Sequence, residues 1–454
     1  MSEPTSSHVS TGQAAPREAQ TQKSSHNEPT TTGPDRIDYV DAQECQKTRQ
    51  REMGEMEDGG VPVKRIHGQA ELEAFLGSQA LDRILQVLLG ISNRTARFGI
   101  VRTDKQVVYL RDSILASAPI RAIIHILEQL DLWISDIPLD PAPQRFGNKA
   151  FKLWGLRLES EAQKLHASLI ADHHKPIEKE LLHHFKTAFG SFGRLDYGTG
   201  HELSFLAYLS ILHLTRILKP KDLLLTGLVV YQKYFNLCRK LHRVYNLEPA
   251  GSKGVYGLDD YFHVVYIFGS AQLLNHPTIT PAMIMDEKFV RRLNDLKQVE
   301  GCGDSGVGLS ASSVEFMERE GLRQSLFFES VLNTITLKSR SLSGNDNKTG
   351  TEEDGEARPG SFLDHSPILL NLATNVKGWP KIYTGLIKMM KGEIFSKLPV
   401  MQHFWIAGPA AVLPWKPLPS SVAPPPPPSH HCSESAEDVD ADPDYANYYR
   451  HLFP

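Results

Sequence analysis

The sequence has few of the features that mark a secreted, membrane-spanning or disulfide-bonded protein. Its four cysteines lie far apart and form no C-x-x-C pair, so neither a disulfide framework nor a cysteine-based zinc site is expected. The first residues, MSEPTSSHVSTGQ, contain no basic segment followed by an apolar stretch. No window reaches the roughly 18 continuous apolar residues that cross a membrane. We therefore expect an intracellular chain in a reducing compartment, with no membrane partner.

The sequence also lacks an excess of charge of either sign. It has 49 basic and 53 acidic residues, a formal net charge of −4, and no segment rich enough in Lys and Arg to follow a phosphate backbone. Nucleic acid is therefore not an expected partner. With 454 residues, of which 41% are hydrophobic, the chain is long enough for one large core or two ordinary ones.

Both ends of the chain are poor in large apolar side chains, and we predict disordered tails over residues 1–61 and 409–454. Such segments cannot bury enough apolar surface to offset the entropy cost of ordering. The second tail contains five prolines at 424–428, followed by the acidic stretch ESAEDVDADPD. This tail would act as a spacer or solubilising segment, or alternatively as a docking peptide for another protein.

Between the tails, apolar residues repeat with the period of a helix, which predicts a single all-α domain over residues 62–408. Apolar side chains recur at i, i+3, i+4 and i+7 from Leu81, and again from Ile120. Residues 201–218 are apolar around most of the helix circumference, as expected of a central helix. Another long helix is predicted over residues 223–245.

A few segments break this helical pattern. Alternating, strand-like sequence is confined to FGIVR at 98–102 and QVVYLRD at 106–112, which could be strands or short extended connections. Two stretches rich in Gly, Ser and charge, near 299–313 and 339–361, are predicted to be mobile surface insertions.

The segment GRLDYGTGHE stands directly before the predicted central helix. Unpaired N–H groups at a helix start, together with the positive end of the helix dipole, bind phosphate oxygens, and Arg194 could add a charge-assisted contact. The same spacing fits a capping box formed by Thr199 and Glu202, and spacing alone does not separate the two interpretations. His201 is interpreted as structural. The sequence has no G-x-x-x-x-G-K-[ST] motif.

Two further polar segments lie at the edges of helices. In RFGNKAF, Asn148 or Gly147 could simply cap the helix that follows. In KLPVMQHFWIAG, Gln402 and His403 stand inside an apolar run. A buried histidine with its hydrogen bonds satisfied is the usual meaning of such a residue, and contact with an adenine or a phosphate is the alternative.

The long glycine-rich loop YNLEPAGSKGVYGLDDY is the most informative segment. Its adjacent carboxylates, Asp259 and Asp260, could bind Mg²⁺ with water and phosphate oxygens completing the coordination, or could cap a helix that begins near Tyr261. The aromatic faces of Tyr256, Tyr261 and Phe262 suit a proline ring. A loop of this length and composition is more than a connection needs.

Taken together, these segments resemble the phosphotyrosyl phosphatase activator family, also described as the serine/threonine phosphatase 2A activators with peptidyl-prolyl isomerase activity. The motifs that carry the resemblance are RFGNKAF, RLDYGTGHE, LEPAGSKGVYGLDDY, GSAQL, NHP and LPVMQHF, with LDLWISDIP and FLDHSPIL as further agreement. They run in order from about Arg65 to Gly408, and the tailed form looks like a fungal member. The chain departs from the family pattern at Lys253, where His or Gln is common, and at Tyr256 and Phe268, where Trp is usual.

The resemblance implies an all-α fold with core, lid and linker subdomains, ATP bound between core and linker, and a peptide groove at the core–lid boundary. Carried over residue by residue, the nucleotide contacts would be Arg194, Thr199, Gly200, Gln402 and His403. The Mg²⁺ positions would be Gly254 and Asp260. The groove and isomerase residues would be Tyr256, Gly257 and Asp259.

The function implied by the resemblance is activation of type 2A phosphatases in the cytoplasm and nucleus. The chain would bind the phosphatase catalytic subunit and a proline-containing peptide segment, promote the active metal-loaded state, and isomerise prolyl bonds. A peptide-induced homodimer is also implied. One alternative is a helical adaptor that binds the phosphatase without isomerase or ATP-linked activity. A free-standing ATPase is disfavoured, because no P-loop lysine or obvious catalytic base lies near the glycine-rich segments.

Overall fold

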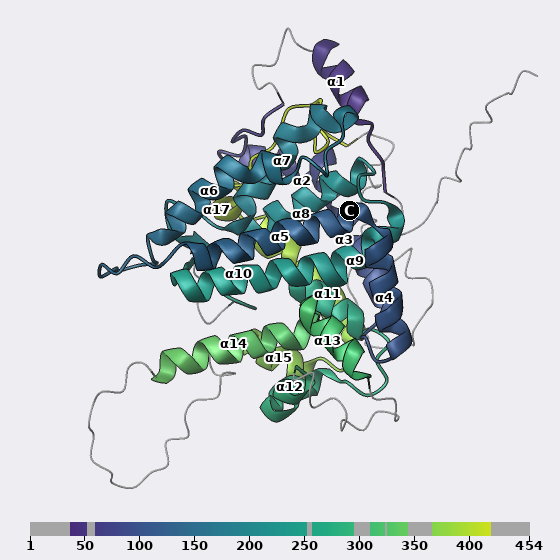
Figure 1. Cartoon of the computed structure of the whole chain (residues 1–454), viewed down its shortest axis with the longest axis vertical. Helices are drawn as coiled ribbons and strands as arrows, with labels where there is room; N and C mark the ends of the chain where they lie inside the picture. Colours follow the sequence, from purple (N-terminus) through teal and green to yellow (C-terminus); the bar gives the residue numbers. More distant parts are fainter. Residues whose placement is uncertain are drawn as a thin grey trace, which may run out of the picture.

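Helices make up nearly all of the regular structure in the computed structural model, which describes residues 37–51, 60–251, 257–294, 309–322, 325–343 and 366–418. Figure 1 shows them as stacked layers, with α3, α5, α8 and α10 through the middle and α12 to α15 below. The named strands within these residues are β1 (Asp196–Tyr197) and β2 (Glu248–Pro249), which form one short parallel pair. The predicted all-α fold is confirmed.

The bounds of the elements follow the chain in order. In the first half they are α1 (Ala42–Arg51), α2 (Gln69–Leu76), α3 (Gln79–Phe98), α4 (Asp104–Ala116), α5 (Ala118–Asp136), α6 (Ala150–Leu165), η1 (Asp172–Ile177), α7 (Glu178–Lys186), η2 (Thr187–Phe189), α8 (Thr199–Leu214), η3 (Pro220–Asp222), α9 (Leu223–Leu225), the π-helical turn η4 (Thr226–Val230) and α10 (Tyr231–Tyr245). In the second half they are α11 (Val264–Leu273), η6 (Pro281–Met285), α12 (Glu287–Leu293), α13 (Ala311–Arg319), α14 (Leu326–Ser343), α15 (Pro367–Asn375), α16 (Trp379–Met390), the π-helical turn η9 (Lys391–Phe395) and α17 (Leu398–Met401).

Helix α8 is the centre of the core, as predicted from its uniformly apolar sequence. Every residue from Glu202 to Leu214 is buried, and the helix packs against both α3 and α7. Its polar side chains have partners: His213 Nε2 lies 2.9 Å from Thr226 Oγ1, and the Tyr208 hydroxyl lies 3.0 Å from His166 Nε2. A helix that is buried all round needs such internal partners, because no face is open to water. The long helix predicted over 223–245 is also present, as the continuous run of α9, η4 and α10.

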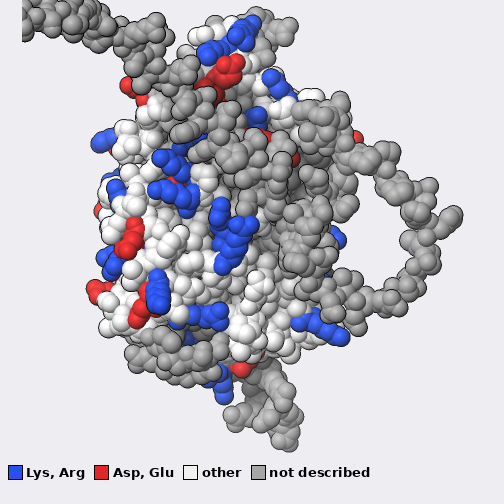
Figure 2. All heavy atoms as spheres, turned by 90° about the vertical axis from the view of Figure 1, so that its right-hand side faces the viewer, with Lys and Arg blue, Asp and Glu red and all other residues white. Residues whose placement is uncertain are grey.

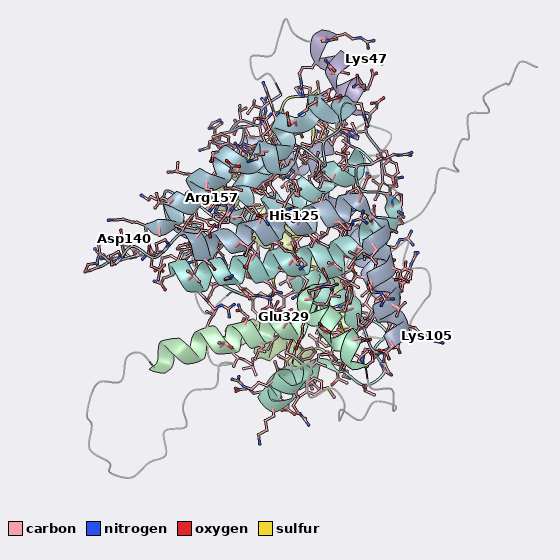
Figure 3. All side chains as sticks on the ribbon, viewed as in Figure 1. Lys47, Lys105, His125, Asp140, Arg157 and Glu329 are labelled. Carbon is pink, nitrogen blue, oxygen red and sulfur yellow. The ribbon has the colours of Figure 1, made fainter. Side chains whose placement is uncertain are left out.

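Helix α14 is held closely against the core on two sides. On one side, α11 approaches so near that a Cβ on Gly269 would lie 2.2 Å from the backbone nitrogen of Phe327, so only glycine fits there. On the other side, the buried guanidinium of Arg239 on α10 pairs with Glu329 at 2.8 Å and donates to Ser330 Oγ at 2.9 Å. Figure 3 shows Glu329 between α10 and α14. A shift of α14 would separate Arg239 from Glu329 and leave a buried charge without its partner, which is strongly destabilising. This ion pair therefore fixes the position of α14 on the core.

The ordered helical part extends beyond the predicted domain of 62–408 at both ends, so the tail boundaries at 61 and 409 were wrong. Near the start, Ile37 and Cys45 are buried, and α1 packs on η1. Near the end, Val412 and Leu413 are buried, and their N–H groups donate to the Glu180 carboxylate at 2.9 and 2.8 Å. Short apolar clusters within polar sequence can dock on an existing core although they cannot form one. The other tail residues lie outside the described part.

Two local predictions also need correction. The strand-like segment 106–112 belongs to helix α4, which Thr103 caps by accepting from Gln106 N at 3.3 Å. The predicted insertions are shorter than expected, because residues from Ser310 onward form the cap and body of α13 and because α14 continues to Ser343. The intervening parts of both insertions are outside the described residues.

Two features of the described residues concern the cysteines and the apolar helices. Cys45 and Cys238 are both buried and both carry free thiols. No helix in the described ranges is long and apolar enough to span a membrane.

The C-terminal boundary can be tested by truncation. A chain that ends at Leu418 should keep the melting temperature of the full chain. A chain that ends at Pro409 should melt lower, because it loses four buried residues, Ala410 to Leu413, and leaves the buried Glu180 carboxylate without its two N–H donors. Losing the Val and Leu side chains alone costs at least about 3 kcal/mol. Equal melting temperatures, measured by circular dichroism, would show that residues 410–418 contribute nothing to the core.

Candidate functional site

Two of the glycine-containing polar segments, RLDYGTGHE and LEPAGSKG, are joined by the short parallel pair β1–β2. Asp196 pairs with Glu248, and Tyr197 with Pro249. The ladder is extended by Ala250, whose N–H donates to Tyr197 O at 2.7 Å. A Cβ on Gly198 would lie 2.9 Å from Ala250 O, so a side chain does not fit there. The segment RLDYGTGHE and the start of LEPAGSKG therefore lie side by side.

The RFGNKAF segment also lies beside β1 and the end of α10. Asn148 N donates to Tyr245 O at 2.6 Å, at the end of α10, and Asn148 Oδ1 accepts from Ala150 N at 3.0 Å. Helix α6 has Lys149 as its N-cap and no side-chain cap, so Asn148 closes a turn just before the helix and does not cap it. Gly147 has a left-handed φ of 34°, and its Cβ would lie 2.7 Å from Leu195 Cβ. Figure 3 marks the α5–α6 connection, which contains this turn, by Asp140 at the left of the view.

Helix α8 begins at Thr199 without the capping box that was one of the two interpretations of this segment. Its N-cap is Gly198, in an extended conformation, and no side chain caps the first turn. Glu202 is buried and turns instead to α11, where its two carboxylate oxygens accept from His263 N at 2.8 Å and from Val264 N at 2.9 Å. Burial raises the pKa of Glu202 to about 8, although these backbone donors oppose the shift. His201 N donates to Gly198 O at 2.9 Å, so among the described residues the N–H groups of Thr199 and Gly200 are the ones left for other acceptors.

The QHF segment lies against the start of α8. A Cβ on Gly200 would lie 3.6 Å from Val400 Cγ1, and Gln402 Nε2 donates weakly to Pro399 O at 3.4 Å. The chain then pairs antiparallel with the start of the domain, because Val63 and Ile406 exchange two backbone hydrogen bonds of 3.2 and 3.0 Å. This pairing keeps His403 at the surface beside α8.

Two of the predicted nucleotide contacts, Arg194 and His403, lie near enough to each other for their charges to interact. The pKa of His403 lies below its ordinary value, first because of partial burial and then because Arg194 and Lys64 are near. The pKa of His201 is also lowered by burial, with contributions from Arg194 and His403, and its Nδ1 donates to Thr187 O at 2.7 Å. The structure therefore brings Arg194 and His403 together at the start of α8.

Two residues of this face were missed from the sequence, Asp196 and Lys64. Asp196 Oδ2 accepts from Arg194 Nε at 2.7 Å, while its Oδ1 is buried with no hydrogen-bond partner among the described residues. A buried carboxylate oxygen without a donor indicates a place for a cation or a donor from a ligand. The signal was present, because Asp196 lies inside RLDYGTGHE. Lys64 could not be assigned to this face from the sequence, because more than a hundred residues separate it from Arg194.

The chemistry of this face is that of an anion site. The N–H groups of Thr199 and Gly200 and the cationic groups of Arg194 and Lys64 suit phosphate oxygens, while His403, whose pKa is lowered, would act as a neutral hydrogen-bonding group. No group of three or more His, Cys, Asp or Glu in the described residues could hold a metal by itself. A Mg²⁺ ion held by one or two carboxylates, with phosphate and water completing its shell, needs no such group.

The predicted isomerase residues are only partly described. Tyr256 and Gly254 lie outside the described residues, as does Lys253. Gly257 and Asp260 are half-buried. Phe268 is fully buried in α11, with its ring 4.9 Å from that of Tyr231, and so it belongs to the core.

Asp259 is tied to the protein through both carboxylate oxygens. Oδ1 accepts from Tyr261 N at 2.8 Å and Phe262 N at 3.1 Å, and Oδ2 accepts from the Tyr266 hydroxyl at 2.9 Å. Helix α11 starts only at Val264, so Asp259 closes a turn ahead of the helix and does not cap a helix near Tyr261. This arrangement sets the path of the loop that carries Gly257 and Asp260.

Comparison with known protein families gives one extended match. A family model described as "Phosphotyrosyl phosphate activator (PTPA) protein" matches residues 62–415. The chain belongs to this family. The match contains every segment that meets around β1, β2 and the start of α8.

Individual relatives of this PTPA-family chain agree. It is 32% identical over 361 residues to a "Probable serine/threonine-protein phosphatase 2A activator 2" of Dictyostelium discoideum, covering 78% of this chain and 65% of that protein. It is 31% identical to a "Serine/threonine-protein phosphatase 2A activator 1" of Schizosaccharomyces pombe, covering 79% and 92%. The crystal structure of "the PP2A phosphatase activator Ypa1 PTPA1" superposes with a TM-score of 0.59 at 27% identity, covering 79% of this chain and 96% of that one.

The shared face makes a prediction that does not depend on any ligand. Arg194→Ala should raise the pKa of His403, because it removes a positive charge that now disfavours protonation of the imidazole. The measurement is an NMR titration of the His403 ring protons. Arg157→Ala is the matched control, since Arg157 is also exposed and also paired with an aspartate, Asp136, at 2.8 Å. An unchanged His403 pKa in Arg194→Ala, or an equal change in Arg157→Ala, would contradict the shared face.

Proposed function

We propose that this chain activates type 2A serine/threonine phosphatases, binding Mg²⁺–ATP at the start of α8 and the phosphatase catalytic subunit beside it. The observation that carries the proposal is that the start of α8 lies beside the QHF segment, with Arg194 near His403 and Gly200 against Val400, although about 200 residues separate the two segments. The family match supports the activator role, and the relatives are named as activators of phosphatase 2A.

The nucleotide would be held by this chain's own cationic and N–H groups. Arg194 keeps its Nη groups for phosphate while its Nε is fixed by Asp196, so the guanidinium is oriented before a ligand arrives. The backbone N–H groups of Thr199 and Gly200 would add contacts at the positive end of the α8 dipole. Gln402 and His403 would contact the adenine or a phosphate. Mg²⁺ would be held by Asp260 and Gly254.

Bound Mg²⁺–ATP would supply a phosphoryl group that can be transferred to water. Two carboxyl groups of the face are engaged elsewhere, because Asp196 orients Arg194 through Oδ2 and Glu202 is buried against α11, so we assign neither of them the role of a base that orients an attacking water. We therefore propose that this chain binds and orients the nucleotide, and that the phosphatase catalytic subunit completes the site and excludes water.

Binding of a proline-containing segment, with isomerase activity, is the second part of the proposal. Rotation about a prolyl bond breaks no covalent bond, so the protein needs only to hold the twisted form. Asp259 is fully hydrogen-bonded, which suits it to holding the loop of Tyr256 and Gly257 rather than to proton transfer. The alternative is a helical adaptor that binds the phosphatase without isomerase or ATP-linked activity, and the hydrogen-bonded state of Asp259 fits the absence of isomerase activity in that alternative.

Nucleotide binding should depend on Arg194. Arg194→Ala should weaken ATP binding about tenfold to a hundredfold, because a charge-assisted contact to phosphate contributes about 1.5–3 kcal/mol. The measurement is isothermal titration calorimetry with Mg²⁺–ATP, and Arg157→Ala should bind as the wild-type chain does. Unaltered affinity in Arg194→Ala would refute a phosphate site at this residue.

Phosphatase activation should depend on Asp260 and should accompany ATP turnover. The isolated chain should release almost no phosphate from ATP, whereas a mixture with inactive catalytic subunit should show both turnover and restored phosphatase activity. Asp260→Ala should lose both, and Asp136→Ala, which removes an exposed aspartate elsewhere, should lose neither. Equal turnover with and without the catalytic subunit would instead identify a free-standing ATPase.

A further inference from the structure

Trp405 presents an exposed aromatic ring beside the candidate site. The residue is 41% exposed, while its neighbours in the chain, Phe404 and Ile406, are buried. Successive side chains of an extended segment point to opposite sides, so this alternation turns Trp405 outward. His403, two residues earlier, is also exposed. The indole therefore lies at the surface within two residues of a predicted nucleotide contact.

One face of the Trp405 ring is packed against α7. The ring stacks on that of His183, with the centroids 5.3 Å apart and an interplanar angle of 18°. The next residues repeat the arrangement, because Phe404 stacks on His184 at 5.3 Å and 30°. Figure 1 shows α7 and α17, which directly precedes this segment, beside α8. Two successive histidines thus hold two successive rings, which fixes the direction of the indole and leaves its other face as the exposed one.

The imidazole that supports Trp405 is uncharged. Burial lowers the pKa of His183 to about 4, and the charge of Lys186 lowers it further. The ring is therefore neutral at neutral pH and packs as a flat, weakly polar surface. A neutral support adds no positive charge beneath the indole, so the exposed face keeps the properties of an aromatic platform.

Lys64 stands opposite Trp405 on the paired segment. The residues next to them, Val63 and Ile406, form an antiparallel bridge, and the following pair across such a bridge shares the opposite face. Both side chains of this following pair are exposed, which agrees with a shared outer face. The charge of Lys64 also lowers the pKa of His403, so the lysine lies near that residue too. An ammonium group and an aromatic platform therefore meet at one place on the surface.

The stack is also connected to the start of α8. Thr187 Oγ1 donates to His183 O at 3.0 Å, and Thr187 O accepts from His201 Nδ1 at 2.7 Å. His201 belongs to the first turn of α8, which starts at Thr199. In this series of contacts, two residues stand between the first turn of α8 and the indole of Trp405. The aromatic platform and the N–H groups at the helix start therefore belong to the same region of the surface.

We propose that Trp405 stacks on the base of a bound purine nucleoside triphosphate, whose phosphates lie at Arg194, Lys64 and the start of α8. The inference rests on the proposed function and adds to it the residue that recognises the base. The indole offers a flat face in a fixed direction, and the purine is the flat apolar group of Mg²⁺–ATP. Stacking depends on the area and flatness of the base rather than on its polar edge. The platform therefore favours purines over the smaller pyrimidines.

Calorimetric titration of the full chain with two ligands tests the proposal, because only one of the two has a base. Trp405→Ala should weaken the binding of Mg²⁺–ATP about tenfold, the usual effect of losing a base–aromatic stack, and should leave the binding of Mg²⁺–tripolyphosphate unchanged. Trp405→Phe keeps a flat ring and should bind ATP nearly as tightly as the wild-type chain. Arg194→Ala should weaken the binding of both ligands, because it acts on the phosphates.

Cations elsewhere on the surface require a matched control. Figure 2 faces the side that carries α4 and shows Lys and Arg side chains gathered near its centre. Tyr109 on α4 is an aromatic residue that is 54% exposed. Tyr109→Ala removes an exposed ring as Trp405→Ala does, and it should leave the binding of both ligands unchanged.

Tryptophan fluorescence gives a second measurement, since Trp405 is the exposed member of the chain's five tryptophans. Mg²⁺–ATP should quench the fluorescence of the wild-type chain, Mg²⁺–tripolyphosphate should not, and the quenching should disappear in Trp405→Phe. Unaltered ATP affinity in Trp405→Ala, or an equal loss for both ligands, would overturn the stack while leaving the phosphate site in place. A weaker ATP complex in Tyr109→Ala would overturn it in favour of the α4 side. A wild-type chain that binds neither ligand would overturn the proposed nucleotide site and this inference with it.

Discussion

The buried carboxylate of Glu202 is the contact on which the geometry of the candidate site depends. It stands in the first turn of α8 yet accepts hydrogen bonds from His263, Val264 and Val265, which start α11. The Glu202 side chain thus accepts hydrogen bonds from the first N–H groups of α11. Because it points toward α11, it does not cap the N–H groups at the start of its own helix, α8. The loop with Asp259 and Asp260 comes directly before His263, so this contact also sets where that loop can lie. A carboxylate held by three backbone donors in the core leaves little freedom to either segment.

The same contact explains which part of the site the sequence could predict. The helix start at Thr199 could be predicted, because a helix start with glycines is a local property of RLDYGTGHE. That this start binds a nucleotide stays a prediction. The capping box was wrong because Thr199 and Glu202 have the right spacing, but the partner of Glu202 lies 61 residues away. Spacing rules describe neighbours along the chain and cannot include a competing acceptor or donor from another element. Asp259 illustrates the same limit, since it closes a turn and reaches Tyr266.

The fold was predictable where apolar periodicity is long, and less so where it is short. Helix α8 and the run from α9 to α10 have enough buried positions to outweigh any local preference. Helix α4 was obscured by its β-branched and aromatic residues, although Val107, Leu110 and Ile114 are buried at helical spacing. The segments near Ile37 and Val412 were missed for a different reason. They contain too few apolar residues to form a core, but they dock on one that exists, and Glu180 accepts the backbone N–H groups of the second.

The candidate site at the start of α8 holds its main cation in one direction. Arg194 is already paired with Asp196, so its charge is partly balanced and the direction of its guanidinium is fixed. Such a pair gives modest attraction at long range but precise placement, which suits a ligand whose phosphates must meet particular N–H groups. The pairing of Arg194 with Asp196, rather than the number of cations, therefore supports a defined nucleotide as the proposed ligand.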